Sequence, residues 1–285
     1  MIVVTGATGT VGGAVARLLT EAGEKVTAVS RRITAADAPD GAMAMRADLA
    51  DADSLRPALE GAGAVFLVPA GDLLGGAGSP DDLVAAIEAA GVRRVVLLSS
   101  QASETRPEAI SHARLREFEA VLRASRLNWT ILRPGGFASN TYAHVASVRA
   151  DRTVAAPFGD VGLPLVDPDD VAEVAAAALR DGRHGGRTYV LTGPAAVTPR
   201  EQTAAIGAAI GVELGFTELT REQAMGRLSQ VMPVPVADGT LDIMGAPTAG
   251  ELAISPHVEE VLGRAPRSFA AWAERNAAAF GTMAG

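Results

Sequence analysis

The chain contains no cysteine, and that absence removes several functional classes at once. Disulfide bonds, thiolate catalysis and cysteine-ligated metal sites are all excluded. The histidines show no metal-ligand spacing either, since they are scattered at His112, His144, His184 and His257. We therefore expect no bound metal, and the lack of cysteine fits a reducing cytoplasm.

Clustered positive charge and long apolar runs are missing as well. The formal net charge is -8, and no run of basic residues suggests an arm for nucleic acid or a basic membrane patch. No apolar run reaches the length of a membrane span, and the first residues form a core strand pattern rather than a signal peptide. We expect a cytoplasmic protein that binds neither nucleic acid nor a membrane.

What is present is an alternation of short apolar runs and helical patterns in the first half. Strand, helix and strand at this spacing predict βαβ units and a parallel sheet covered on both faces. The fold class is therefore α/β, with a doubly wound Rossmann sheet. The predicted strands are Ile2–Thr5, Val26–Ser30, Ala42–Met45, Ala64–Val68, Val95–Ser99 and Trp129–Leu132, and the predicted helices lie near Val11–Ala22, Asp53–Leu59, Asp81–Ala90 and Glu108–Ser125.

The second half adds a helix, a strand and a cap. Asp167-Pro-Asp-Asp170 starts a helix, because proline and acids suit a first turn, and Arg187–Thr192 is one more strand. From Thr198 the pattern is mainly helical with Gly/Pro-rich interruptions. We expect residues 1–155 to form the Rossmann domain, with 166–197 returning to it. Residues 136–165 and 198–285 should form a smaller, mainly helical C-terminal cap that completes a substrate cleft.

The strongest signal is the glycine-rich turn Gly6-Ala-Thr-Gly9-Thr-Val-Gly12 between the first strand and the first helix. Gly6 permits the tight turn, Gly9 lets the backbone approach a pyrophosphate, and Gly12 lets the helix pack closely on the sheet. The helix start offers N–H groups and partial positive charge to phosphates. An ordinary structural turn is the alternative, but the strand-turn-helix context is the one that dinucleotide binding requires. The predicted cofactor contacts here are Gly6, Thr8, Gly9, Thr10 and Val11.

Two arginines, Arg31 and Arg32, end the second predicted strand. An NAD site usually places an acid there for the ribose hydroxyls, whereas a guanidinium matches the 2′-phosphate of NADP in charge and geometry. A solvated arginine pair is the alternative. The position, about twenty residues past the glycines, is the expected one for ribose recognition, so NADP(H) is the favoured cofactor.

Further cofactor contacts are expected where the other strands end, because the ligand of a doubly wound sheet lies across the carboxyl ends of its strands. Asp48 could accept a hydrogen bond from the adenine amino group, or could equally be an acid at a helix entry. The remaining predicted contacts are Leu49, Val68, Pro69, Ala70, Ser99, Pro134 and Phe137.

These segments, taken in order, resemble the NmrA-like branch of the atypical short-chain dehydrogenase/reductases, and within it the bacterial NAD(P)H:quinone oxidoreductases. The resemblance spans the chain and implies the fold, an NADP(H) cofactor and a homodimer. It leaves the reaction open, because the branch includes quinone reductases, other reductases, tailoring proteins and redox-sensing regulators. The segments that carry it are Thr5-Gly-Ala-Thr-Gly9, Arg31, Ala47-Asp48-Leu49, Leu98-Ser-Ser100, Trp129-Thr-Ile-Leu-Arg-Pro134-Gly-Gly-Phe137 and Val166-Asp-Pro-Asp-Asp-Val171.

The Tyr-x-x-x-Lys pair, with which short-chain dehydrogenases interconvert alcohols and ketones, is absent. Lys25 is the only lysine, and neither Tyr142 nor Tyr189 has a lysine four residues on. The expected positions hold Ser111 and Leu115. This argues against an alcohol dehydrogenase or a sugar epimerase. Reduction of a quinone or an activated olefin survives the loss, because the resulting anion is resonance-stabilised and water or a weak acid can protonate it.

Few residues could assist such a reduction. Ser100 and Gln101 could hydrogen-bond a substrate carbonyl, or could simply cap a strand end. His112 could donate a proton, or could be an exposed histidine at a helix start. Other residues could line the cleft or be ordinary loop and core residues, and these are Asn140, Tyr142, His144, Met225, Met232 and Trp272.

Three functions fit these observations. The leading hypothesis is an NADPH-dependent reductase of a quinone or conjugated carbonyl compound, polyketide-like aromatic substrates included. The second is a non-catalytic NADP(H) sensor of the NmrA type that binds a protein partner. The third is a biosynthetic tailoring enzyme of the same fold, which the sequence does not separate from the first.

Overall fold

The computed structural model describes residues 1–281 and contains a seven-stranded parallel sheet with the order β3-β2-β1-β4-β5-β6-β8. Parallel pairing joins every neighbour in it. Each predicted strand is present with its ends shifted by at most two residues, which confirms the doubly wound class. The strands are β1 (Ile2–Thr5), β2 (Val26–Ser30), β3 (Met43–Arg46), β4 (Ala64–Leu67), β5 (Arg94–Leu98), β6 (Asn128–Pro134) and β8 (Arg187–Leu191).

Helices cover both faces of this sheet. One face packs against α1 (Thr10–Glu21), α7 (Pro168–Arg180) and α12 (His257–Leu262). The other packs against α2 (Ala52–Leu59), α3 (Pro80–Ala89) and α5 (Ala113–Ala124). Short helical turns connect these elements; they are η1 (Ala35–Asp37), η2 (Gly71–Leu73), α4 (Ala102–Thr105), η3 (Ile110–His112) and η5 (Gly182–His184).

Strand β1 illustrates why the apolar runs predict a doubly covered sheet. Successive side chains of a strand point to opposite faces. Val3 accordingly joins the core beneath α2, α3 and α5, while Ile2 and Val4 join the core beneath α1 and α7. An uninterrupted apolar strand is therefore buried on both sides, which is the pattern of a parallel sheet between two helical layers.

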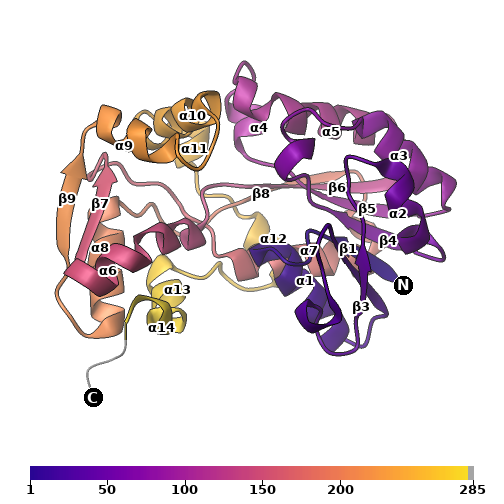
Figure 1. The fold of residues 1–285 in the computed structure, drawn as a ribbon, viewed down its shortest axis with the longest axis horizontal. Coiled ribbons are helices and arrows are strands. Elements are labelled where there is room, and N and C mark those ends of the chain that lie inside the picture. Colours follow the sequence, from indigo (N-terminus) through magenta and orange to yellow (C-terminus); the bar gives the residue numbers. More distant parts are fainter. Residues whose placement is uncertain (282–285) are drawn as a thin grey trace.

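The cap holds the remaining elements and lies beside the carboxyl edge of the sheet (Figure 1). The predicted helical character is confirmed, but the cap also contains a two-stranded parallel sheet of β7 (Thr153–Pro157) and β9 (Gly215–Leu219) that the sequence did not indicate. Strand β9 is largely exposed, so it lacks the apolar run that marks a buried strand. The cap helices are η4 (Ala138–His144), α6 (Val145–Asp151), α8 (Pro199–Ile210), α9 (Arg221–Leu228), α10 (Val234–Gly245), α11 (Ala249–Leu252), α13 (Phe269–Arg275) and α14 (Ala277–Phe280).

Helix α7 starts where Asp167-Pro-Asp-Asp170 predicts. The Asp167 carboxylate accepts the N–H of Asp169 at 3.0 Å, and Pro168 occupies the first helical position. Because α7 leads into the parallel strand β8, its N-terminus lies at the carboxyl edge of the sheet. Among residues 1–281, no helix is both long and apolar enough to cross a membrane.

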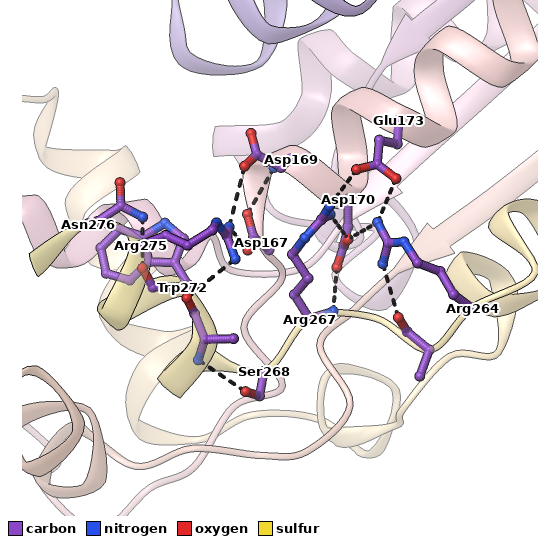
Figure 2. A network of polar contacts seen from close by, with 12 residues as sticks. Asp167, Asp169, Asp170, Glu173, Arg264, Arg267, Ser268, Trp272, Arg275 and Asn276 are labelled. Carbon is purple, nitrogen blue, oxygen red and sulfur yellow. Dashed lines mark hydrogen bonds and ion pairs between the residues drawn. The ribbon is translucent and has the colours of Figure 1, made fainter. Parts of the chain in front are cut away.

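A cluster of acids and arginines, shown in Figure 2, fastens the C-terminal segment to the start of α7. Asp170 is fully buried and accepts the backbone N–H of Arg267 at 2.7 Å and the Arg264 guanidinium at 2.8 Å. Both arginines also bind Glu173 at 2.6 Å. Burial raises the pKa of Glu173, but hydrogen bonds from these arginines outweigh it, and the net pKa is lowered. Beside this cluster Arg275 pairs with Asp167.

Asp170 should therefore matter more to stability than its neighbour. We expect Asp170→Asn to lower the free energy of unfolding by about 3 kcal/mol, because two arginines lose their buried partner. Asp169→Asn is the matched control, since Asp169 is 43% exposed and 3.3 Å from Arg275, and should cost less than about 1 kcal/mol. Urea unfolding measures both. Equal losses in the two variants would show that the buried cluster does not fasten the C-terminal segment.

Candidate functional site

The glycine-rich turn has the close packing that its sequence predicts. Gly6 has a φ of +63°, and a Cβ on it would lie 3.1 Å from the Cβ of Val68. A Cβ on Gly12 would lie 2.3 Å from the carbonyl oxygen of Gly6, closer than any side chain tolerates. Helix α1 therefore begins directly against the end of β1.

The start of α1 is arranged to receive an anion. The first intrahelical bond runs from the N–H of Gly13 to the carbonyl of Gly9 at 2.8 Å, so the N–H groups of Thr10 and Val11 precede it without helical acceptors. Thr8, Gly9 and Thr10 are exposed, and the first turn of α1 contains no acid. These amides and the helix dipole suit a pyrophosphate.

The ends of β2 and β4 contact this turn from its two sides. The hydroxyls of Thr8 and Ser30 are 3.0 Å apart. On the other side, buried Thr5 donates to the carbonyl of Phe66 and accepts the N–H of Val68, both at 2.9 Å. The sequence did not single out Thr5, because a threonine in an apolar strand has no pattern of its own. Pro69 is buried and Ala70 exposed just beyond.

Arg31 and Arg32 both extend into solvent just past β2, so guanidinium charge is present at the predicted place. Arg31 forms an ion pair there with Asp72 of η2, in which Nη1 of Arg31 lies 2.7 Å from Oδ2 of Asp72. A 2′-phosphate bound at this strand end would meet both arginines and this acid.

The loop after β3 uses Asp48 for its own shape. One carboxylate oxygen accepts the N–H of Ala50 at 3.0 Å, and the backbone N–H of Asp48 bonds the hydroxyl of Ser54 at 2.9 Å. The cap of α2 is Asp51, not Asp48. Leu49 packs against the core below. Asp48 thus organises the loop that would border an adenine, and adenine contact stays a prediction.

A buried ion pair lies beneath the ends of β5 and β6. Glu119, 1% exposed, accepts Nε and Nη2 of Arg133 at 2.9 and 2.7 Å and the hydroxyl of Ser99 at 2.6 Å. Burial raises the pKa of Glu119, but the hydrogen bonds from Arg133 and Ser99 and the nearby arginine charges lower it overall. The Ser99 hydroxyl is therefore committed to the protein interior, and Ser99 could contact a cofactor only through its backbone.

The predicted helpers Ser100 and Gln101 follow β5 at the same edge. The Ser100 hydroxyl accepts the N–H of Ala102 at 3.2 Å, and within residues 1–281 it forms no other hydrogen bond, so its proton can be donated. The Gln101 side chain is 7% exposed, and its amide donates to the carbonyl of Gly250 at 2.8 Å. One of its two amide protons is thus used to bind the cap, a role that the sequence did not indicate.

The cap is tied to this edge by a second buried ion pair. Arg106 binds Glu251 through Nε and Nη2, each at 2.8 Å, and Thr105 donates to the same carboxylate at 2.9 Å. Glu251 is 3% exposed. Burial raises the pKa of Glu251, but the hydrogen bond from Arg106 and those from Thr248 and Thr105 lower it overall. Segment 101–106 and helix α11 are therefore held together.

His112 lies between the Rossmann domain and the cap. It ends η3, against which α10 packs so closely that a Cβ on Gly239 would lie 2.9 Å from the hydroxyl of Ser111. The Nδ1 of His112 is 3.0 Å from that hydroxyl. Burial lowers the pKa of His112, and the charge of Arg116 lowers it further. His112 does stand at a helix start, as the N-cap of α5, but it is half-buried at the junction with the cap rather than exposed.

The residues predicted to line the cleft, or else to be ordinary loop and core residues, differ in their surroundings. Phe137 is half-buried and packs against the core beneath α1 and α7. Tyr142 stacks with Phe280 and meets Trp272 edge-on, with ring centroids 5.9 and 5.1 Å apart, and its hydroxyl bonds Asn276. Trp272 is 2% exposed and packs inside the cap, whereas Tyr142 is 39% exposed and covers it from the surface. Asn140 is exposed, and His144, Met225 and Met232 are half-buried.

Residues 6–182 match a family of NAD(P)H-binding proteins, and the chain belongs to this family. It is 39% identical over 284 residues to the (4-alkanoyl-5-oxo-2,5-dihydrofuran-3-yl)methyl phosphate reductase of Streptomyces griseus, which covers 98% of this chain and 99% of that protein. It is 32% identical over 292 residues to the NAD(P)H azoreductase of Xenophilus azovorans, which covers 99% of each.

Solved structures share the fold. The NADPH-dependent quinone oxidoreductase of Escherichia coli, solved with NADPH, matches with a TM-score of 0.80 and 25% identity over 96% of this chain and 99% of that one. The negative transcriptional regulator NmrA matches with a TM-score of 0.73 at 18% identity, which shows the fold alone. The predicted relationship to NAD(P)H-dependent quinone oxidoreductases and the predicted nicotinamide cofactor are confirmed. The protein is an NAD(P)H-dependent oxidoreductase.

Gly12 should be the least replaceable residue of the cofactor cradle. We expect Gly12→Ala to cost about 3 kcal/mol of folding free energy and to weaken dinucleotide binding, because the new Cβ forces α1 away from the turn. Gly226→Ala in α9 is the control, since nothing lies within 4 Å of its added Cβ. Helix propensity predicts a gain of about 1 kcal/mol there. Urea unfolding measures the free energy of unfolding of both variants. An unchanged value in Gly12→Ala would contradict the close packing of α1 against the turn.

Two half-buried histidines predict a pH-dependent stability. Burial is the main cause that lowers the pKa of His112 and His144 from 6.5, and a nearby arginine adds to it in each case. Just below pH 6.5 the unfolded chain therefore binds protons that the folded chain does not. Stability contributed by these groups is complete above 6.5 and is lost as the pH falls through the folded-state values.

We expect a lower urea midpoint at about pH 5.5 than at about pH 7.5. Replacing both histidines by glutamine should reduce the difference without abolishing it, because burial also lowers the pKa of His184 and that imidazole remains. The carboxylates of Glu119 and Glu251 have lowered pKa values and keep their charge across this range. A midpoint that does not change between the two pH values would contradict the prediction.

Proposed function

We propose that this chain is an NADPH-dependent reductase that delivers hydride to an electron-poor atom of a conjugated carbonyl compound, quinones included. The observation that carries the proposal is a combination at one edge of the sheet. A dinucleotide cradle lies there, yet Ser111 and Leu115 occupy the positions of the usual Tyr-Lys pair. The edge can thus hold a hydride donor but lacks the strong acid–base pair that alcohol–ketone chemistry needs.

The cofactor would be held by groups along this edge. The N–H groups of Thr10 and Val11 suit the pyrophosphate, and Gly6, Thr8 and Gly9 shape the turn that presents them, with the N–H of Gly9 donating to the carbonyl of Gly6 at 2.9 Å. The guanidinium groups of Arg31 and Arg32 suit the 2′-phosphate. Asp48 and Leu49 would border the adenine, and the remaining backbone neighbours of the ribose and nicotinamide would be Val68, Pro69, Ala70, Ser99, Pro134 and Phe137.

Bound NADPH supplies the hydride, so the protein must orient the acceptor and stabilise the anion that forms. The Ser100 hydroxyl has its proton available at the cofactor edge and would hydrogen-bond the developing oxyanion. Gln101, fixed by Gly250, would form the wall beside it. His112 lies at the junction with the cap, where it would serve as a proton donor through its ring.

The names of the relatives support this substrate class. The dihydrofuranone named for the Streptomyces griseus reductase is a conjugated carbonyl compound that carries an alkanoyl group. The other named relatives reduce an azo compound and a quinone, and both are conjugated, electron-poor acceptors. An acceptor of this kind yields a resonance-stabilised anion, which requires no strong acid at the moment of hydride transfer.

NADPH oxidation with a panel of quinones and conjugated enones or lactones tests the proposal. We expect turnover that is faster with NADPH than with NADH. Arg31→Ala should raise the Kd for NADPH by about tenfold or more, because a charge-assisted hydrogen bond to the phosphate is lost, and should leave the Kd for NADH nearly unchanged. No turnover across the panel would refute the reductase. Equal effects on both dinucleotides would refute the role of Arg31.

A further inference from the structure

Asp72 is the acid that occupies Arg31. It lies in η2, which follows β4, whereas Arg31 follows β2. Their charged atoms are 2.7 Å apart, and the side chains are 52% exposed for Arg31 and 72% exposed for Asp72. An exposed pair of this kind contributes little to folding, so its effect must be sought in what else could bind the same guanidinium.

The topology places this pair across the cofactor cradle. In the sheet, β2 and β4 are the two neighbours of β1, whose end forms the glycine-rich turn. The turn contacts both neighbours, through Thr8 with Ser30 on one side and Gly6 with Val68 on the other. Arg31 and Asp72 therefore join the two chain segments that flank the turn, at the edge where a dinucleotide would lie.

The position of Asp72 is fixed by the loop that carries it. Gly71 has a φ of +56°, and a Cβ on it would lie 3.1 Å from Nη2 of Arg31, so glycine leaves room for the guanidinium. Leu73 is 2% exposed and anchors the loop in the core. From α5, Arg114 donates to the carbonyls of Leu73 and Ala77 at 3.2 and 3.3 Å. The loop cannot easily withdraw the acid.

We infer that Asp72 sets the dinucleotide preference of this chain by competing with the 2′-phosphate of NADPH for the Arg31 guanidinium. The inference rests on the proposed use of Arg31 for that phosphate. A doubly charged phosphate displaces a single exposed carboxylate, but the displaced Asp72 stays nearby on its braced loop and repels it. NADH carries no such phosphate and does not meet this competition. Selectivity for NADPH is therefore smaller than Arg31 alone would give.

Arg32 separates this mechanism from a general effect of charge. It is exposed, and within residues 1–281 it forms no ion pair, so it can bind the phosphate whether or not Asp72 is present. A variant that removes the charge of Asp72 should therefore act through Arg31. Its effect should largely vanish once Arg31 is gone.

The test compares Asp72→Asn with Glu24→Gln in the full chain. Glu24 pairs with Arg180 at 3.1 Å near the opposite edge of the sheet, so the control makes the same change in net charge away from the cradle. Fluorescence titration gives the Kd for NADPH and NADH. We expect Asp72→Asn to tighten NADPH by about fivefold at low salt and NADH by less than about twofold. At about 1 M salt the gain should shrink, and Glu24→Gln should change neither Kd.

The Arg31→Ala background completes the test. There, Asp72→Asn should tighten NADPH by less than about twofold, because no guanidinium remains to be released. An equal gain with and without Arg31 would overturn the competition. The competition would also be overturned if Asp72→Asn bound both dinucleotides with the same ratio of NADPH to NADH affinity as the wild-type chain. If the wild-type chain bound neither dinucleotide, the proposed function would fail and this inference with it.

Discussion

The close approach of helix α1 to the end of β1 is the constraint on which the rest of the structure depends. At Gly12 a side chain would lie 2.3 Å from the carbonyl of Gly6, so the helix can start only where glycine stands. That contact directs the first amides of α1 along the carboxyl edge of the sheet. The ends of β2 and β4 then contact the turn through Thr8 and Val68, so the predicted cofactor contacts at the turn and just past these two strands take their positions from this arrangement.

Within residues 1–281, four buried acids hold the surroundings of that edge, and arginine is the partner of each; one of them is Asp167, paired with Arg275 at the start of α7. Glu119 joins α5 to β6 through Arg133, Asp170 joins α7 to the C-terminal segment, and Glu251 joins the cap to the segment after β5. The Asp170 and Glu251 pairs join residues that are distant in sequence, whereas the Glu119 pair joins two consecutive elements. Buried ion pairs add little net stability compared with apolar packing, but a carboxylate without its arginine is costly. These clusters therefore select one arrangement of the segments around the site, while the apolar core supplies most of the stability.

The sequence predicts the parts of this fold that follow from periodicity and local chemistry. The continuous apolar strands, the glycine turn and the Asp167-Pro168 helix start all depend on near neighbours. The long-range polar contacts could not be predicted in this way. Nothing near Gln101 indicates a bond to Gly250, and nothing near Arg31 indicates Asp72, because only the fold brings them together. Strand β9 was missed because a largely exposed strand shows no apolar run, and its partner β7 is only five residues long.

The junction between Arg106 and Glu251 bears on how such a protein can acquire a new substrate. The residues predicted to line a substrate cleft belong mainly to the cap, whereas Arg106 follows a strand of the nucleotide-binding half. If the cap were replaced by that of a relative, Arg106 would lose Glu251 as its buried partner unless segment 101–106 were replaced as well. Recombination between relatives should therefore succeed when both stretches are exchanged together, which makes them a single unit of inheritance despite the long separation between them in the gene.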